Sequence, residues 1–436
     1  MLKLYPHQIK VLDKTAGLNR CAYYLDMGLG KTFVGAEKMI QLGNKINLVI
    51  CQKSKIDDWI EHFRIVPNTD GFLMDDVFDL TDKKQFELFT KMTSMKVFPP
   101  RYMFVGVINY ELAWRRQELA ELKDFTLMLD ESSLIQNEEA KQSEFILKKL
   151  HPDNVILLSG TPVSGKYENL WSQCQLLGWN INRQIYDRQY INWTTIDVAG
   201  VPHKIVDKSD PYKNVDRLKR KLWEHGAVFM KTEECFELPE QTFIKNYVST
   251  SKEYKRFKQT GYVCVDDIEL IADTSLTKRL YMRQLCSTYS REKLKAFEDL
   301  LESTNDRLIV FYNFTCELEE LLAIVCEREI PHSIVNGIDK DLYSYERYDN
   351  SVTFVQYQAG AMGLNLQKAN KIIYYSLPER SDLFEQSKKR IHRIGQTQPC
   401  FYYVMLCRNS IEEDIYEALE EKRDYTDELF RKGFTN

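Results

Sequence analysis

Short apolar segments rich in β-branched residues recur along the chain, separated by amphipathic stretches. This pattern is typical of parallel strands joined by crossover helices. The first set of segments comprises residues 46–51, 103–108, 125–129 and 155–158. A second set follows much later and comprises residues 308–311, 333–335, 352–355, 372–375 and 401–406. We therefore expect an α/β protein with two mostly parallel sheets, each flanked by helices.

The length of the chain also indicates two domains, because 436 residues exceed what one hydrophobic core usually serves. Residues 167–305 are polar and predicted to be mostly helical, with turn-rich breaks at 198–202 and 209–211. Pro239 disfavours helix on its N-terminal side. We therefore predict an N-terminal domain at 1–238 with a helical extension, and a C-terminal domain at 239–436 with a helical insertion.

Charge narrows the possible partners. The formal net charge of −5 argues against a protein that coats nucleic acid by bulk attraction, so a polyanion would have to bind a local basic patch. Each candidate patch taken alone is typical of a solvated helix face. The candidates are Arg217 with residues 219–221, Lys278 with Arg279, and residues 388–390 with Arg393.

The chain contains no run of about 18 apolar residues, so we expect no membrane span and a cytoplasmic protein. Its ten cysteines are scattered, without a C-x-x-C pair or a cysteine–histidine grouping. This spacing indicates neither a zinc site nor a disulfide framework. We expect buried, reduced thiols.

A glycine-rich turn provides the sharpest motif. Residues 26–32 (D-M-G-L-G-K-T) follow the apolar segment 21–25 and precede an amphipathic run at 33–42. Glycines allow backbone N–H groups and a helix N-terminus to point at phosphate oxygens. Lys31 is then expected to reach the β- and γ-phosphates of ATP, and Thr32 to bind Mg²⁺. Leu25 stands where the strict G-x-x-x-x-G-K-T pattern has glycine, and a chance turn remains the alternative.

Two acids, Asp130 and Glu131, end the apolar segment 125–129. Neighbouring side chains at a strand end point in different directions. Asp130 can therefore face Mg²⁺ while Glu131 faces the water that attacks the γ-phosphate, as base or as orienting group. A solvated strand end is the alternative for this pair taken alone.

Together with other segments, these motifs follow the order found in Swi/Snf-like ATPases of helicase superfamily two. The segments that resemble the Q motif and motifs I, II and III are 4–8, 26–32, 130–133 and 159–162. Those that resemble the R-x-x-C segment and motifs IV, V and VI are 283–287, 308–314, 359–366 and 386–396. The last ends in H-R-I-G-Q, the most specific string. The resemblance implies two tandem RecA-like P-loop domains and a compact bacterial or bacteriophage-type DNA translocase related to DEAD/DEAH-box proteins.

The same resemblance implies a nucleotide site that both domains share. The residues implied to bind ATP are Gln8, Gly28, Leu29, Gly30, Lys31, Thr32, Gly363 and Asn365. The residues implied to be catalytic are Lys31, Asp130, Glu131, Gln386, Arg390 and Arg393. Arg390 and Arg393, three positions apart, are expected on one helix face as arginine fingers. The alternative is a basic helix that faces DNA together with Lys388 and Lys389.

Positions in the family motifs also imply contacts with a nucleic-acid backbone. The residues concerned are Lys53, Ser54, Asn109, Tyr110, Asn313 and Gln358. Motif II reads D-E-S-S where many relatives have D-E-A-H, which leaves hydrolysis intact but puts its coupling to DNA in doubt. The hydroxyl of Ser133 is a candidate for part of the missing link.

The leading hypothesis is an ATP- and Mg²⁺-dependent translocase or remodelling enzyme that moves along double-stranded DNA as a monomer. One alternative is a helicase that separates DNA or RNA strands. It requires a strand-splitting hairpin, which the sequence does not show. Another alternative is a loading or switch protein gated by nucleotide, with slow hydrolysis that is indifferent to nucleic acid.

Overall fold

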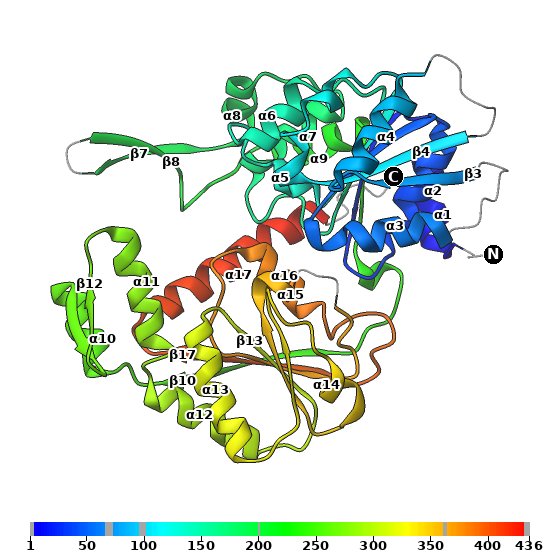
Figure 1. Ribbon diagram of the computed structural model, residues 1–436. Helices are drawn as coiled ribbons and strands as arrows, with labels where there is room; N and C mark the ends of the chain where they lie inside the picture. Colours follow the sequence, from blue (N-terminus) through cyan, green and yellow to red (C-terminus); the bar gives the residue numbers. More distant parts are fainter. Residues whose placement is uncertain (1–3, 66–72, 96–101, 199–200, 361–363, 431–436) are drawn as a thin grey trace. The chain divides into compact units, whose positions relative to one another are not determined.

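The computed structural model describes residues 4–65, 73–95, 102–198, 201–360 and 364–430. The chain forms two compact units, Met1–Cys235 together with Asp424–Asn436, and Phe236–Arg423. The sequence had placed the boundary between Leu238 and Pro239. Each unit contains one large parallel sheet with flanking helices (Figure 1). The predicted fold class, two tandem RecA-like domains, is therefore confirmed.

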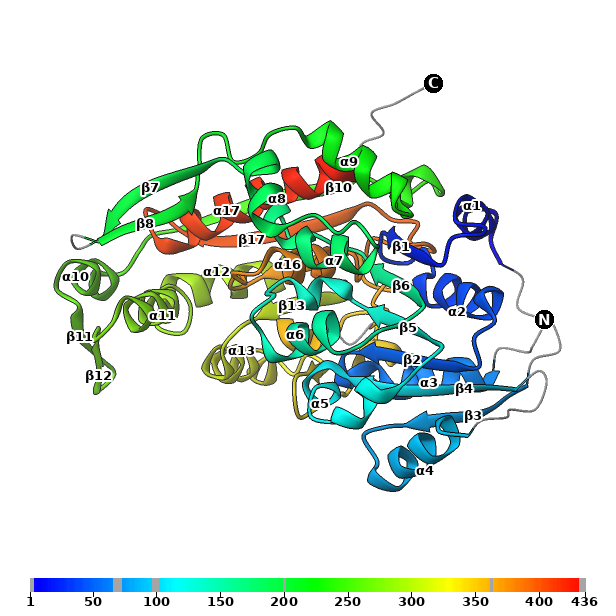
Figure 2. The same cartoon turned by 90° about the horizontal axis from the view of Figure 1, so that it is seen from above.

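The sheet of the first unit has seven strands in the order β3-β4-β2-β5-β6-β1-β9, and its pairings are parallel. Figure 2 shows β4, β2, β5, β6 and β1 side by side. The strands are β1 (Arg20–Leu25), β2 (Ile46–Cys51), β3 (Leu73–Asp79), β4 (Tyr102–Asn109), β5 (Phe125–Asp130), β6 (Asn154–Ser159) and β9 (Ala227–Met230). The central strands are buried on both faces, which explains why they read as continuous apolar runs.

Nine α-helices flank this sheet or connect its strands among the described residues of the first unit. They are α1 (Pro6–Lys14), α2 (Lys31–Leu42), α3 (Ile56–Ile65), α4 (Lys83–Thr93), α5 (Tyr110–Ala113), α6 (Lys141–Lys148), α7 (Trp171–Leu176), α8 (Arg183–Tyr190) and α9 (Val215–Glu224). Short 3₁₀ turns include η1 (Lys53–Lys55), η3 (Ser132–Ile135) and η5 (Thr232–Glu234). Parallel strands bring motifs I, II and III to one edge, because motif-bearing turns follow the carboxyl ends of β1, β5 and β6.

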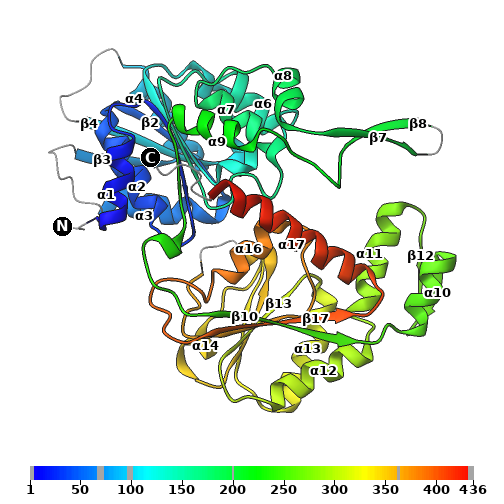
Figure 3. The ribbon, with the colours of Figure 1, turned by 180° about the vertical axis from the view of Figure 1, so that it is seen from behind.

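The expectation of a mostly helical segment at 167–305 is partly wrong. Strands β7 (Trp193–Val198) and β8 (Val201–Val206) pair antiparallel as a hairpin within the stretch that had been taken as a helix break. This hairpin projects from the rest of the first unit (Figures 1 and 3). A second hairpin joins β11 (Tyr262–Val265) to β12 (Ile268–Ile271). Both were missed because short strands with polar side chains carry no strong alternation of apolar and polar residues.

The sheet of the second unit has six strands in the order β10-β17-β16-β13-β15-β14, with parallel pairings. The strands are β10 (Gln241–Val248), β13 (Leu308–Tyr312), β14 (His332–Val335), β15 (Val352–Gln356), β16 (Lys371–Tyr374) and β17 (Cys400–Cys407). The helices are α10 (Lys252–Thr260), α11 (Ser275–Cys286), α12 (Arg291–Glu302), α13 (Thr315–Glu327), α14 (Tyr343–Arg347), α15 (Tyr357–Gly360), α16 (Ser381–Lys388) and α17 (Ile411–Phe430). The second set of apolar segments therefore corresponds to the strands β13 to β17.

Six cysteines are buried as expected, but Cys264 and Cys326 are exposed and Cys235 and Cys316 lie partly exposed. All ten are free thiols. Within the described part of the chain, no helix combines the length and the apolar character needed to cross a bilayer.

Candidate nucleotide-binding site

Motif I forms the turn between β1 and α2. Gly28 and Gly30 have φ angles of 88° and 74°, in the left-handed region where glycine is favoured. This conformation lets the turn end in the N-terminus of α2, where unpaired N–H groups and the helix dipole favour an anion. Lys31 Nζ lies 3.0 Å from the carbonyl oxygen of Leu25. A longer contact of 3.5 Å joins the same Nζ to the carbonyl oxygen of Asp26, and phosphate oxygens could replace both backbone acceptors.

The Q motif is hydrogen-bonded to the same turn. Gln8 Nε2 donates to the carbonyl oxygen of Leu29 at 3.2 Å, and Tyr5 N donates to Gln8 Oε1 at 2.9 Å. A second contact joins His7 Nε2 and the Leu29 oxygen at 3.0 Å. A Cβ at Gly30 would lie 2.2 Å from Gln8 Nε2, so a larger residue there would clash. Gln8 therefore lies against the glycine turn, where the resemblance placed an adenine contact.

Motif II places Asp130 at the carboxyl end of β5. Trp59 Nε1 on α3 donates to Asp130 Oδ2 at 2.9 Å, and the Tyr110 hydroxyl donates to the backbone oxygen of Asp130 at 2.9 Å. Burial raises the pKa of the Asp130 carboxyl, while the Trp59 hydrogen bond and the positive charge of Lys31 oppose that rise. The predicted metal ligand thus lies within the field of the motif I lysine.

Sequence reasoning missed Trp59, although its indole N–H orients the carboxylate of Asp130. The Trp59 ring is almost fully buried and stacks on Phe63, with centroids 5.5 Å apart. The only sequence signal for Trp59 was its position on the apolar face of the helix 56–65, and residues at such positions ordinarily pack into the hydrophobic core.

Motifs II and III are joined by side-chain hydrogen bonds. Ser159 Oγ donates to Glu131 Oε2 at 3.2 Å, and Thr161 N donates to Ser159 Oγ at 3.1 Å. Glu131 itself adopts a left-handed φ of 54°, a backbone conformation that non-glycine residues rarely hold without a local reason. The carboxylate of Glu131 is therefore oriented by motif III.

A second connection between motifs II and III runs through Gln173. Ser132 Oγ donates to Gln173 Oε1 at 2.7 Å, and Gln173 Nε2 donates to the carbonyl oxygen of Pro162 at 2.8 Å. Tyr24 OH donates to the same Gln173 oxygen at 2.9 Å. Ser132 therefore links motif II to motif III, while the suggested part of Ser133 in coupling to DNA stays a prediction.

Motif VI differs from its prediction. Helix α16 ends at Lys388, and Arg390 and Arg393 lie in the turns that follow, not on one helix face. The Arg390 carbonyl accepts Leu366 N at 3.1 Å instead of continuing the helix. Gln396 Nε2 donates to the carbonyl oxygens of Gln367 and Ala369 at 3.1 and 2.9 Å. The residues after Lys388 therefore form hydrogen bonds with residues 366–369 in place of a continued helix.

The two arginines of motif VI have different surroundings. Arg390 is buried, and its Nη1 lies 3.4 Å from the carbonyl oxygen of Leu364 in motif V. Arg393 is partly exposed, and burial lowers the pKa of its guanidinium. Gln386 is also largely buried. Lys388 is buried and forms an ion pair with Glu385 at 2.5 Å, which removes it from the suggested DNA-facing surface.

In motif V, Gly363 lies outside the described residues, and Asn365 is exposed. In motif IV, Asn313 Nδ2 donates to Ser376 Oγ at 2.8 Å and to the carbonyl oxygen of Leu377 at 3.0 Å. Glu317 Oε2 accepts Asn313 N at 2.9 Å and Ser376 Oγ at 2.8 Å. Both amide hydrogens of Asn313 are therefore used within the unit.

The remaining residues predicted to contact nucleic acid are distributed unevenly. Lys53, Ser54 and Gln358 are exposed, as such a contact requires. Asn109 is largely buried, and its Nδ2 donates to Glu111 Oε2 at 2.6 Å. Tyr110 is 1% exposed, and its hydroxyl holds motif II, so its predicted contact with nucleic acid is wrong in this structure.

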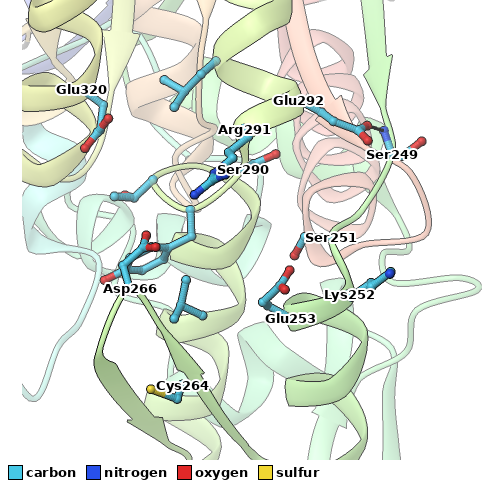
Figure 4. A pocket seen from close by; sticks show the side chains of 14 residues that line it. Ser249, Ser251, Lys252, Glu253, Cys264, Asp266, Ser290, Arg291, Glu292 and Glu320 are labelled. Atoms are coloured by element: carbon cyan, nitrogen blue, oxygen red, sulfur yellow. Dashed lines mark hydrogen bonds between the residues drawn. The ribbon is translucent and has the colours of Figure 1, made fainter.

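A hollow of about 700 Å³ in the second unit lies outside the motifs. Lys252 and Glu253 at the start of α10, Asp266, and Arg291 with Glu292 at the start of α12 line it (Figure 4). Glu292 Oε2 accepts Ser249 N at 3.0 Å across one side. Acidic and basic groups are mixed around its wall, so the hollow does not define a preferred ligand charge.

The fold and the site define a P-loop nucleoside triphosphatase with two RecA-like domains. Motif I, motif II and motif III converge at adjacent strand ends of the first, and motifs IV to VI belong to the second. Residues 21–299 match a family model described as the SNF2-related domain, and residues 292–395 match the helicase conserved C-terminal domain. The first match alone covers more than half of the chain, which therefore belongs to the SNF2-related family.

Relatives in this family come from distant organisms. The chain is 24% identical over 442 residues to mouse SWI/SNF-related matrix-associated actin-dependent regulator of chromatin subfamily A member 1, covering 91% of this chain and 40% of that protein. It is 24% identical to an uncharacterized ATP-dependent helicase of Mycoplasma pneumoniae, covering 92% of this chain and 39% of the relative. It is 23% identical to the uncharacterized ATP-dependent helicase YqhH of Bacillus subtilis, covering 96% of this chain and 78% of that protein.

The chain thus spans about two fifths of the length of the first two relatives. A solved SWI2/SNF2 ATPase core of Sulfolobus solfataricus, in complex with double-stranded DNA, is 18% identical with a TM-score of 0.44, covering 98% of this chain and 93% of that one.

Proposed function

We propose that the protein is an ATP-dependent motor that hydrolyses ATP to move along double-stranded DNA. The observation that carries this proposal is the convergence of Lys31, Asp130 and Glu131 at the carboxyl edge of one sheet, with Ser159 oriented on Glu131. Family membership supports the same activity, since relatives are named ATP-dependent helicases.

The residues present fit a magnesium nucleotide. Gly30 has a left-handed φ and a Cβ there would lie 2.2 Å from Gln8 Nε2, whereas a Cβ at Gly160 would lie 3.3 Å from Lys31 Nζ. Thr32 and Asp130 are the residues that would hold Mg²⁺, which supplies charge neutralisation for the phosphates. Oxygen donors of this kind suit that hard cation.

The proposed roles of the chain's own residues follow from their positions. Lys31 exchanges the Leu25 oxygen for phosphate oxygens, and Gln8 orients the adenine edge. Glu131, held by Ser159, orients the attacking water and takes its proton. Arg393 from the second unit stabilises charge on the γ-phosphate, with Gln386 and Asn365 completing the closed site. Arg390 is buried, and its Nη1 would exchange the Leu364 oxygen for a phosphate oxygen.

Domain closure on ATP and opening after hydrolysis would turn this chemistry into movement, if each unit also binds a DNA backbone. Lys53, Ser54 and Gln358 are the exposed candidates for those contacts, and the Asn109 and Asn313 side chains offer only their remaining amide atoms. We propose a monomer in the bacterial or virus-infected cytoplasm, where duplex DNA is available.

Steady-state ATP hydrolysis with no nucleic acid, single-stranded DNA, duplex DNA and duplex RNA tests the proposal. Strong stimulation by duplex DNA is expected, and Lys31→Ala provides the inactive control. Equal rates under all four conditions would instead identify a nucleotide-gated switch. Greater stimulation by duplex RNA or single strands would reject duplex DNA as the track.

One observation favours a second candidate, a strand-separating helicase. The sequence showed no hairpin, whereas β7 and β8 form one with Ile196 and Val201 exposed toward its turn. Apolar side chains at such a position can wedge between bases. If the protein is such a helicase, the intact chain should unwind a forked duplex. The double variant Ile196→Ser/Val201→Ser should lose unwinding while it continues to hydrolyse ATP.

A further inference from the structure

The segment that leads out of the first unit is hydrogen-bonded to the start of the glycine turn. Strand β9 is the edge strand next to β1, and the turn η5 follows it directly before the second unit begins at Phe236. Asp26 N donates to the carbonyl oxygen of Met230 at 3.0 Å. Asp26, the first residue of motif I, is thereby attached to the end of β9 through its backbone.

The Asp26 carboxylate strengthens this attachment. Its Oδ2 accepts the Thr232 hydroxyl at 3.0 Å and lies 3.5 Å from Thr232 N, while its Oδ1 accepts Met27 N at 2.8 Å. The Thr232 hydroxyl also lies 3.3 Å from the carbonyl oxygen of Met27. One carboxylate therefore holds the glycine turn with one oxygen and η5 with the other.

The Thr232 side chain is fully buried, although η5 is otherwise a short polar turn. A buried hydroxyl bonded to a carboxylate has a defined direction and no competing water. Movement of the Asp26–Met27 peptide must therefore either move Thr232 or break its hydrogen bonds.

We propose that Thr232 is a positioning residue that transmits the nucleotide state of the glycine turn to the segment Lys231–Cys235, which leads to the second unit. The inference rests on the proposed function, because it requires ATP to bind at Lys31 and Thr32. Binding rearranges the turn, Asp26 shifts with it, and Thr232 carries η5 along. Nucleotide occupancy thereby sets the starting direction of the chain that enters the second unit.

Hydrogen–deuterium exchange of the full chain, with and without a non-hydrolysable ATP analogue, provides the test. In the wild type, nucleotide should slow exchange in the peptide 28–35 and change exchange in the peptide 229–236. In Thr232→Val, which keeps the shape and removes the hydroxyl, the first effect should remain and the second should fall at least fivefold. Thr232→Ser, which restores the hydroxyl, should restore the second effect.

Thr15→Val is the matched control, because Thr15 is also fully buried and bonded through its hydroxyl, to Tyr23 OH at 2.5 Å, in the same unit. It should leave the nucleotide effect on 229–236 unchanged. A wild-type effect confined to 28–35, or an effect on 229–236 that survives in Thr232→Val, would overturn the inference. Absence of any nucleotide effect on 28–35 in the wild type would instead reject the proposed function. If Thr232→Val does not fold, Thr232→Ala, which also removes the hydroxyl, takes its place, with the same expected loss of the effect on 229–236.

Discussion

Removing one partner of the buried ion pair in the second unit should destabilise that unit strongly. Lys293 on α12 is 0% exposed, and its Nζ lies 2.5 Å from Oε1 of Glu412 on α17, which is 3% exposed. Glu412 Oε2 also accepts Cys407 N at 2.9 Å. Burial is the largest influence on the pKa of Lys293 and lowers it, but the charge and hydrogen bond of Glu412, together with the neighbouring Cys407 and Cys286, raise that pKa overall. Burial raises the pKa of Glu412, and the charge of Lys293 is the largest influence that opposes this rise, so each group depends on the other to hold its charge.

The substitution Lys293→Met keeps the apolar stem and leaves Glu412 as an uncompensated buried carboxylate. Breaking a buried pair in this way typically costs about 3–5 kcal/mol. For a unit of this size, each kcal/mol shifts the midpoint of thermal unfolding by about 2–4 °C. We expect the second unit to melt about 10 °C lower, with Lys295→Met, an exposed lysine on the same helix, as the matched control.

Calorimetry combined with tryptophan fluorescence assigns the change to the correct unit, since all six tryptophans lie before residue 235. The second unit has no tryptophan, so its unfolding is the calorimetric transition without a matching fluorescence change. The midpoint temperature of that transition should fall. Lys293→Met removes the positive charge and the hydrogen bond that oppose the effect of burial, so the pKa of Glu412 rises further above its value in the unfolded chain. Stability should therefore recover as pH falls from 7 toward 5. Lys293→Met/Glu412→Gln should regain at least half of the loss and show no such recovery. A shift within about 2 °C of Lys295→Met would refute the reasoning.

The other predictions concern the nucleotide site and its surroundings. Glu131→Gln should retain ATP binding and lose turnover by about a hundredfold or more, as expected for loss of a general base, and a near-normal rate would exclude that role. Arg393→Ala should lower kcat by about a thousandfold with ATP affinity largely kept, whereas lower affinity with unchanged kcat would contradict the finger role. Trp59→Phe removes the donor to motif II and should weaken apparent Mg²⁺ affinity about tenfold, relative to Trp171→Phe, which removes another indole hydrogen bond. His62 has a folded pKa of about 4 because burial disfavours its charge, against an ordinary value of 6.5. Between these two pH values the unfolded chain binds a proton that the folded chain does not. The free energy of unfolding should therefore fall from pH 6.5 toward pH 4, and it should fall less steeply in His62→Phe. An identical pH dependence in the two proteins would show that His62 does not cause the fall.

Local patterns predicted the elements around motif I and the central strands. An apolar run, two glycines and an amphipathic run specify a strand, a turn and a helix through backbone preferences of adjacent residues alone. The same reasoning failed at motif VI, because the polar and apolar spacing of 386–393 is compatible with helix. The bonds of Gln396 and the Arg390 carbonyl to residues 366–369, remote in sequence, decide otherwise. The β7–β8 hairpin was missed for a related reason, since its pairing depends on a partner strand and not on a strong local signal.

What the sequence by itself determined about this protein is the order of the motifs, the two-sheet α/β class and the chemistry offered by Lys31, Asp130 and Glu131. The tertiary structure alone decided which side chains meet. Trp59 reaches Asp130 across 71 positions, Lys293 reaches Glu412 across 119, and Thr232 reaches Asp26 across 206. The physical reason is that strand order in each sheet, set by burial of whole strand faces, brings distant segments together, whereas local periodicity reports only which face of each element is buried.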